Sequence, residues 1–140
     1  MSFPDESRDV FCVQGGLHHL NAIPGDLDAV LAEVHRVLRP GGRFVVVEPW
    51  MTPFLGLVHA LCRQAAVRAI SPKFKALDCM IGREGRTYFQ WLSTPAAVMA
   101  SLSRSFEPER VQIAFGKLLW VGTKRVAGAS ARVIPPAGAT

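Results

Sequence analysis

The stretch Asp26–Glu48 holds the clearest pattern of hydrophobic and polar positions in the chain. Hydrophobic residues recur at steps of three and four through its first half, which places them on one face of a helix. Asp26 and Asp28 stand at the start, where carboxylates cap free N–H groups and face the positive end of the helix dipole. Pro40 and the two glycines that follow it cannot continue the helix. The pattern predicts a helix that ends just before Pro40.

Two short hydrophobic runs flank this helix. Phe44–Val47 follows it and ends at Glu48, and Asp9–Val13 precedes it. Neither run alternates with polar residues, which is typical of strands that are covered on both faces in a parallel sheet between helices. A strand, a helix and a strand joined by short connections predict a right-handed βαβ unit.

The rest of the chain divides into a helical part and a hairpin. Phe54–Ile70 has hydrophobic residues at helical spacing, residues 71–86 have the composition of an irregular, mobile excursion, and Tyr88–Leu92 is a short helix. Thr94 is expected to cap a further helix that begins at Pro95 and ends near residue 105.

Two β-rich runs close the ordered part. Arg110–Phe115 and Leu118–Thr123 are separated by Gly116–Lys117, which predicts a hairpin. Residues 126–140 consist largely of Ala, Gly, Pro and Ser, a composition that predicts a disordered tail.

Composition and charge narrow the classes of function. The chain of 140 residues is expected to form one domain. Its net charge of +5 comes from scattered basic residues with no dense cluster, so we expect no nucleic-acid partner. No run reaches the roughly 20 hydrophobic residues of a membrane span, and the polar, acidic first residues do not form a secretory signal. We therefore expect a cytoplasmic protein. Arg63 and Arg68 on Phe54–Ile70 are compatible with contact to a membrane surface, although covering the sheet is the favoured role.

Two segments together resemble a known family. The phrase FPDESRDVFCVQGGLHHL, followed by LAEVHRVLRPGGRFVVVEP, resembles the second half of a class I S-adenosylmethionine-dependent methyltransferase, type 11-like. The resemblance implies that Asp9–Val13 and Arg43–Glu48 are the fourth and fifth strands and that the hairpin is the sixth and seventh. It implies a partial Rossmann-like α/β sheet of order 4-5-7-6 with helices on its faces. Residues 1–125 would form this half domain, and residues 54–92 would form its helical cap over the acceptor.

The resemblance also implies a function, and it shows which parts of the family's domain have no counterpart in this sequence. The family transfers a methyl group from S-adenosylmethionine, here to a small molecule. Strands one to three, the glycine-rich loop and the acidic residue that holds the ribose have no counterpart in this sequence. We therefore expect a truncated domain that is not active alone, with residues 9–13 as an open edge for self-association or a partner strand. The alternative is a non-catalytic remnant or interaction module that pairs through this edge. The acceptor and the methylated atom stay open.

The resemblance places the cofactor at five residues. Phe3 and Pro4 resemble the family's segment beside the adenine, and Val13, Gln14 and Gly15 end the strand that contacts the methionine portion. Plain packing of Phe3 and a plain strand-ending turn at Gly15 are the structural alternatives.

The acceptor is expected near the same strand ends. His18 is the candidate catalytic residue, because a histidine can orient an acceptor or take its proton at neutral pH. His19 and Glu48 are candidate acceptor-binding residues. A helix-start role for the histidines and backbone hydrogen bonds for Glu48 are the alternatives, and we expect no metal site from this pair. Three aromatic residues are candidates for an acceptor pocket, although aromatics at such spacing are more often core: Trp50, Tyr88 and Trp91.

Overall fold

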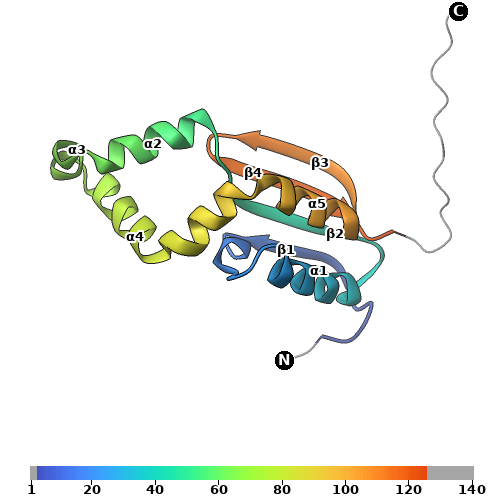
Figure 1. Cartoon of the computed structure of the whole chain (residues 1–140). Helices are drawn as coiled ribbons and strands as arrows, with labels where there is room; N and C mark the ends of the chain where they lie inside the picture. Colours follow the sequence, from blue (N-terminus) through green and yellow to red (C-terminus); the bar gives the residue numbers. More distant parts are fainter. Residues whose placement is uncertain (1–2, 126–140) are drawn as a thin grey trace, which may run out of the picture.

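The computed structural model describes residues 3–125, and the predicted disordered tail, 126–140, lies outside the described residues. Figure 1 shows a sheet, two helices packed against it and a helical projection at one end. In chain order the elements are β1 (Arg8–Gln14), the 3-10 helix η1 (Leu17–His19), α1 (Gly25–Val37), β2 (Leu38–Pro49), α2 (Pro53–Arg63), α3 (Ala65–Ile70), α4 (Pro72–Ser93), α5 (Pro95–Ser105), β3 (Glu107–Ala114) and β4 (Lys117–Thr123).

The four strands form one sheet in the order β1-β2-β4-β3. β1 pairs with β2 in parallel, and β4 pairs antiparallel with both β2 and β3. This is the predicted order 4-5-7-6 with its C-terminal antiparallel hairpin, so the predicted fold class is confirmed. The hairpin turn lies at Phe115 and Gly116, which both have positive φ, one residue earlier than predicted.

One face of the sheet carries the core. The side chains of Phe44, Val46 and Trp120 on this face are buried with residues of α1 and α5, among them Leu31 and Leu102. Both helices therefore lie on the same side of the sheet, as Figure 1 shows.

The opposite face of the sheet is not covered in the same way. Val10 is 56% exposed, and Val45 and Val47 are only half-buried. The prediction that both strands are covered on both faces is therefore wrong for the part of the chain that the structure describes. An unbroken hydrophobic run did not distinguish a doubly covered strand from one whose second face is open.

The first half of β2 uses glycine at a position where a side chain does not fit. A Cβ at Gly42 would lie 2.8 Å from the carbonyl oxygen of Arg39 and 3.1 Å from that of Asp9.

The predicted caps of α1 are wrong, although the helix ends near the predicted place. The Asp26 carboxylate accepts hydrogen bonds from the N–H groups of residues 21 and 22, and Asp28 pairs with Arg104 at 2.8 Å.

The helical projection differs most from the prediction. Residues 71–86 are not an irregular excursion: Ser71 precedes α4, residues 72–86 belong to it, and Tyr88–Leu92 lies in its last turns. Pro72 is the first residue of α4, a position that proline favours. The residues of α4 that face the core, Ile81, Tyr88 and Trp91, keep helical spacing across two glycines. Thr94 precedes α5 as predicted, but its hydroxyl donates back to a carbonyl of α4 and caps no N–H group of α5.

The predicted helix Phe54–Ile70 is confirmed as helical, with an interruption at Gln64 that separates α2 from α3. Its expected role of covering the sheet is not what Figure 1 shows, because α2 and α3 pack against α4 in the projection. Within residues 3–125 no helix has the length and hydrophobicity needed to cross a bilayer. The cytoplasmic location stays a prediction.

Candidate functional site

A cavity of about 420 Å³ lies where β1 and β2 end. Its polar wall consists of Gln14, Gly15, His18, His19, Glu48 and Tyr88. The rest of the lining is more apolar and includes Leu55, Met80, Phe115 and Gly116, together with the charged Lys117. Carboxyl ends of adjacent parallel strands are the usual place for ligands in open α/β sheets.

The polar wall begins with a turn that requires glycine. The chain leaves β1 at Gly15 with a φ of +63°, a conformation that other residues resist. The Gly15 N–H donates to the carbonyl of Val47 at 2.9 Å, which keeps the turn against the end of β2. η1 then places His18 and His19 at the cavity.

Glu48 is the buried centre of this wall, with only 1% of its surface exposed. Its Oε1 accepts hydrogen bonds from the backbone N–H groups of Gly16 and Leu17, both at 2.8 Å. Its Oε2 lies 2.7 Å from Nδ1 of His18. An ionised carboxylate only accepts, so Nδ1 of His18 carries the hydrogen in this contact. Glu48 thus makes the backbone bonds that the alternative interpretation expected, and also fixes the His18 ring.

Aromatic rings extend the site away from the sheet. The rings of His18 and His19 lie against each other, with centroids 4.2 Å apart, and the edge of Tyr88 meets His18 at 5.9 Å. Behind Tyr88, its hydroxyl lies 3.0 Å from Nε2 of His59 on α2. Burial, with a smaller contribution from Arg63, lowers the pKa of His59. His59 was not predicted, because no local motif links it to a tyrosine 29 positions later on another helix.

The other aromatic candidates lie in the core. Trp91 is fully buried, and its Nε1 donates to the carbonyl of Pro49 at 2.8 Å. Trp50 packs edge-on against it with ring centroids 6.3 Å apart. Of the three aromatic candidates, Tyr88 lines the cavity, whereas Trp50 and Trp91 support the segment that follows β2.

The candidate cofactor residues are not brought together in one place. Gln14 and Gly15 line the cavity, and Val13 packs against the core one residue earlier. Phe3 and Pro4 lie before the other end of β1, a strand of seven residues that spans about 23 Å.

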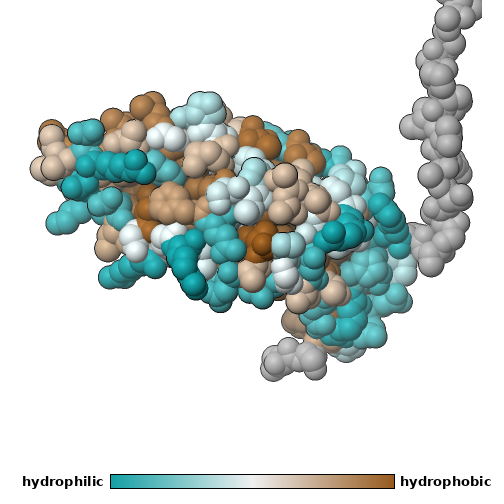
Figure 2. Space-filling view, in the orientation of Figure 1, coloured by the Kyte–Doolittle hydropathy of each residue, from teal (hydrophilic) through white to brown (hydrophobic). Residues whose placement is uncertain are grey.

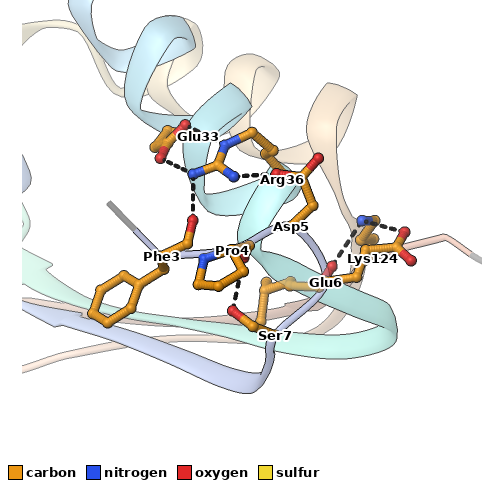
Figure 3. Close-up of polar contacts among 9 residues, drawn as sticks. Phe3, Pro4, Asp5, Glu6, Ser7, Glu33, Arg36 and Lys124 are labelled. Carbon is orange, nitrogen blue, oxygen red and sulfur yellow. Dashed lines mark hydrogen bonds and ion pairs between the residues drawn. The ribbon is translucent and has the colours of Figure 1, made fainter. Parts of the chain in front are cut away.

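Figure 3 shows what holds this N-terminal segment. The Arg36 guanidinium at the end of α1 donates to the Phe3 carbonyl at 2.9 Å and also contacts Asp5 and Glu33. The Arg8 guanidinium lies 4.2 Å above the Phe3 ring. Phe3 itself stays 41% exposed.

The described residues fit part of the predicted cofactor. The exposed backbone at Gln14 and Gly15 can approach a small amino-acid group closely. Glu48 is the sole carboxylate among the described residues that line the cavity, and both of its oxygens are engaged, so none remains for ribose hydroxyls. Within the described part of the chain, no group of three or more His, Cys, Asp or Glu residues could hold a metal ion.

Sequence comparisons point to one family. The family described as "Methyltransferase domain" matches residues 1–46. The chain is 45% identical over 60 residues to a ubiquinone/menaquinone biosynthesis C-methyltransferase from Dinoroseobacter shibae, which covers 43% of this chain and 22% of that protein. It is 32% identical over 81 residues to a demethylmenaquinone methyltransferase from Streptomyces griseus, covering 56% of this chain and 32% of that protein. The chain thus spans about a third or less of these relatives.

A structural comparison agrees on the fold. A possible exported protein from Bordetella parapertussis superposes with a TM-score of 0.58 at 16% identity, covering 89% of this chain and 41% of that chain. The similarity supports the α/β fold, and it says nothing about chemistry at this level of identity.

Proposed function

Since the comparisons confirm the resemblance to class I S-adenosylmethionine-dependent methyltransferases, we propose that this chain forms part of an enzyme that methylates a small molecule. The observation that carries the proposal is the cavity at the carboxyl ends of β1 and β2, with His18 held at its wall by the buried Glu48. The match of residues 1–46 covers β1 and the histidines, which form most of the polar wall.

Gln14 and Gly15 are proposed to hold the methionine portion of S-adenosylmethionine through their backbone. When bound, the cofactor supplies a methyl group on a sulfonium sulfur. The ribose needs partners that the described cavity residues do not offer, so we propose that they come from residues outside this chain. The 140-residue chain is then not expected to turn over alone.

The apolar part of the lining is proposed to take the acceptor. Leu55, Met80 and Phe115 offer apolar contact to a flat ring, and His18 lines the same cavity, where it would orient an acceptor hydroxyl or take its proton. His19 extends this wall by stacking on His18. The names of the relatives, which include a mouse 2-methoxy-6-polyprenyl-1,4-benzoquinol methylase, support a quinol-like ring as the acceptor class.

A cofactor titration followed by amide NMR tests this proposal. Millimolar S-adenosylmethionine is expected to shift the amide signals of Gln14, Gly15 and His18. Gly15→Ala should weaken these shifts, because a side chain at its φ of +63° strains the turn whose backbone the cofactor contacts. Gly82→Ala is the matched control, since a Cβ at that position on α4 meets nothing within 4 Å. No shift at these amides at millimolar cofactor would contradict the proposed site.

A second function, pairing through an open edge, rests on a different observation. In the described sheet β1 is an outer strand, and its Val10 side chain is 56% exposed. An open edge of this kind promotes pairing with another strand. Light scattering should then show a dimer that Val10→Lys dissociates. Val111→Lys on the other edge strand, where the side chain is 45% exposed, should leave the dimer intact. A stable monomer would refute this alternative.

A further inference from the structure

The helical projection and the hairpin tip expose large hydrophobic side chains. We call Phe54, Leu57, Ile70 and Phe115 the apolar rim; they are 49%, 57%, 84% and 80% exposed. The Phe54 and Phe115 rings meet edge to face at 5.9 Å, so α2 and the hairpin tip share one hydrophobic contact. Figure 2 shows hydrophobic residues gathered on the end of the molecule that carries α2 and α3. Single exposed hydrophobic residues are ordinary, whereas a group of this kind marks an interaction surface.

The α2 helix has an unusual outer side for a helix on a protein surface. It carries a single charged residue, Arg63, in its last turn. Its exposed positions run through Phe54, Leu57 and Ala60, which are spaced three apart. Surface helices normally place polar residues on the side that faces water. The outer side of α2 is therefore apolar where solvent contact alone would favour polar residues.

The same segment concentrates the positive charge of the chain. Residues 53–93 contain six basic and two acidic residues, a net charge of +4, out of +5 for the whole chain. In the rest of the described chain the cations are largely paired, as in Arg39 with Asp9 and Arg43 with Glu109. Within residues 3–125, Lys73 and Lys75 form no ion pair, and they follow Ile70 at the far corner of the projection.

Exposed aromatic and aliphatic side chains on a projection that also carries cations outside any ion pair match the chemistry of an anionic bilayer surface. We infer that the apolar rim and the neighbouring lysines dock this protein on a membrane surface that contains anionic lipids, without spanning it. Phe115 belongs to the rim and also lines the cavity, and Leu55 lies in the same first turn of α2 as Phe54. Docking would therefore place the apolar wall of the cavity at the lipid surface.

Vesicle sedimentation with the 140-residue chain tests the inference without cofactor or substrate. The chain should bind vesicles of phosphatidylglycerol and phosphatidylcholine, and bind pure phosphatidylcholine far more weakly. Binding should fall as salt is raised, because the attraction to the surface is screened. Lys73→Gln with Lys75→Gln should weaken binding about 25-fold, from roughly fivefold for each charge near the surface. Phe54→Ser with Phe115→Ser should weaken it by roughly tenfold or more through lost hydrophobic burial.

Matched controls separate this surface from general stickiness. Val111→Ser with Ile113→Ser removes two hydrophobic side chains that are 45% and 47% exposed on β3, and it should leave vesicle binding unchanged. Unchanged melting temperatures would show that the rim variants fold. Equal binding by the rim variants and the wild type, or no binding to anionic vesicles at millimolar lipid, would overturn the inference. So would a dimer in solution that the rim substitutions dissociate, since the rim would then be a protein interface.

Discussion

Replacing Glu48 tests the centre of the site most directly. The carboxylate accepts three hydrogen bonds of 2.7–2.8 Å while 1% exposed, and it receives them from two backbone N–H groups and one imidazole. Each buried donor left without its acceptor costs about 1–3 kcal/mol, and losing one partner of a buried charged pair typically costs about 3–5 kcal/mol in total. We therefore expect Glu48→Ala to lower the free energy of unfolding by about 4 kcal/mol. That is a large share of the roughly 5–15 kcal/mol of a typical domain.

Glu48→Gln separates shape from charge. The amide has the same outline, so its oxygen can still accept from the N–H groups of Gly16 and Leu17. Its NH₂ group would face Nδ1 of His18, which must then give up its hydrogen and become an acceptor. We expect a loss of about 1–2 kcal/mol together with a change of the His18 tautomer.

Urea unfolding and imidazole ¹⁵N shifts measure the two effects. Glu33→Ala is the control, since this glutamate makes an exposed ion pair with Arg36 and its loss should cost less than about 0.5 kcal/mol. The reasoning is refuted if Glu48→Ala, with an unchanged denaturant slope, loses less than about 1 kcal/mol. An unchanged His18 tautomer in Glu48→Gln would show that the carboxylate does not set the ring.

Three further outcomes are expected. Gly42→Ala should lower the free energy of unfolding by about 2 kcal/mol or more, because its Cβ would lie 2.8 Å from a backbone carbonyl oxygen. Gly82→Ala, where a Cβ meets nothing within 4 Å, should raise the free energy of unfolding by about 0.5–1 kcal/mol. Urea unfolding measures both changes. The lowered pKa of His59 means that the unfolded chain binds more protons, so stability should fall as pH drops below about 6.5. Urea unfolding at several pH values should show that the free energy of unfolding falls less at low pH in His59→Phe, a variant that also loses the bond to Tyr88. The same dependence of stability on pH in the variant and the wild type would contradict this. Trp91→Phe should lower the free energy of unfolding by about 1 kcal/mol, because it removes the hydrogen bond from the indole to the Pro49 carbonyl. A melting temperature equal to that of the wild type would refute this expectation.

The parts of the fold that could be predicted are those with strong local patterns. The helix before Pro40 shows its period within a dozen residues, and the two hairpin strands are separated by a turn that contains Gly116. α4 could not be predicted as one helix, because Gly82 and Gly85 lower its local helix propensity. Its helical state depends on packing of Tyr88 and its neighbours, which is a tertiary effect.

The residues of the site also divide into those that the local sequence could predict and those that it could not. Gln14, Gly15 and His18 follow the end of a recognisable strand, so sequence order alone placed them together. The contact between Glu48 and His18 joins residues 30 positions apart, and it was not predicted as an ion pair. It exists because the parallel register sets Gln14 opposite Val47, one residue before Glu48. Such contacts depend on strand register, which composition does not fix.

The same register explains why stability and chemistry are coupled at this end of the sheet. Glu48 continues the buried side of β2 after Phe44 and Val46, so it occupies a position where a hydrophobic residue would pack against the core. A carboxylate there is costly unless its hydrogen bonds are satisfied. Donors on Gly16, Leu17 and His18 satisfy it, and in return they hold η1 and the His18 ring at the cavity. A hydrophobic residue at this position would leave the N–H groups of Gly16 and Leu17 without their acceptor and release His18. The buried charge is therefore best explained by what it positions, and not by what it adds to the core.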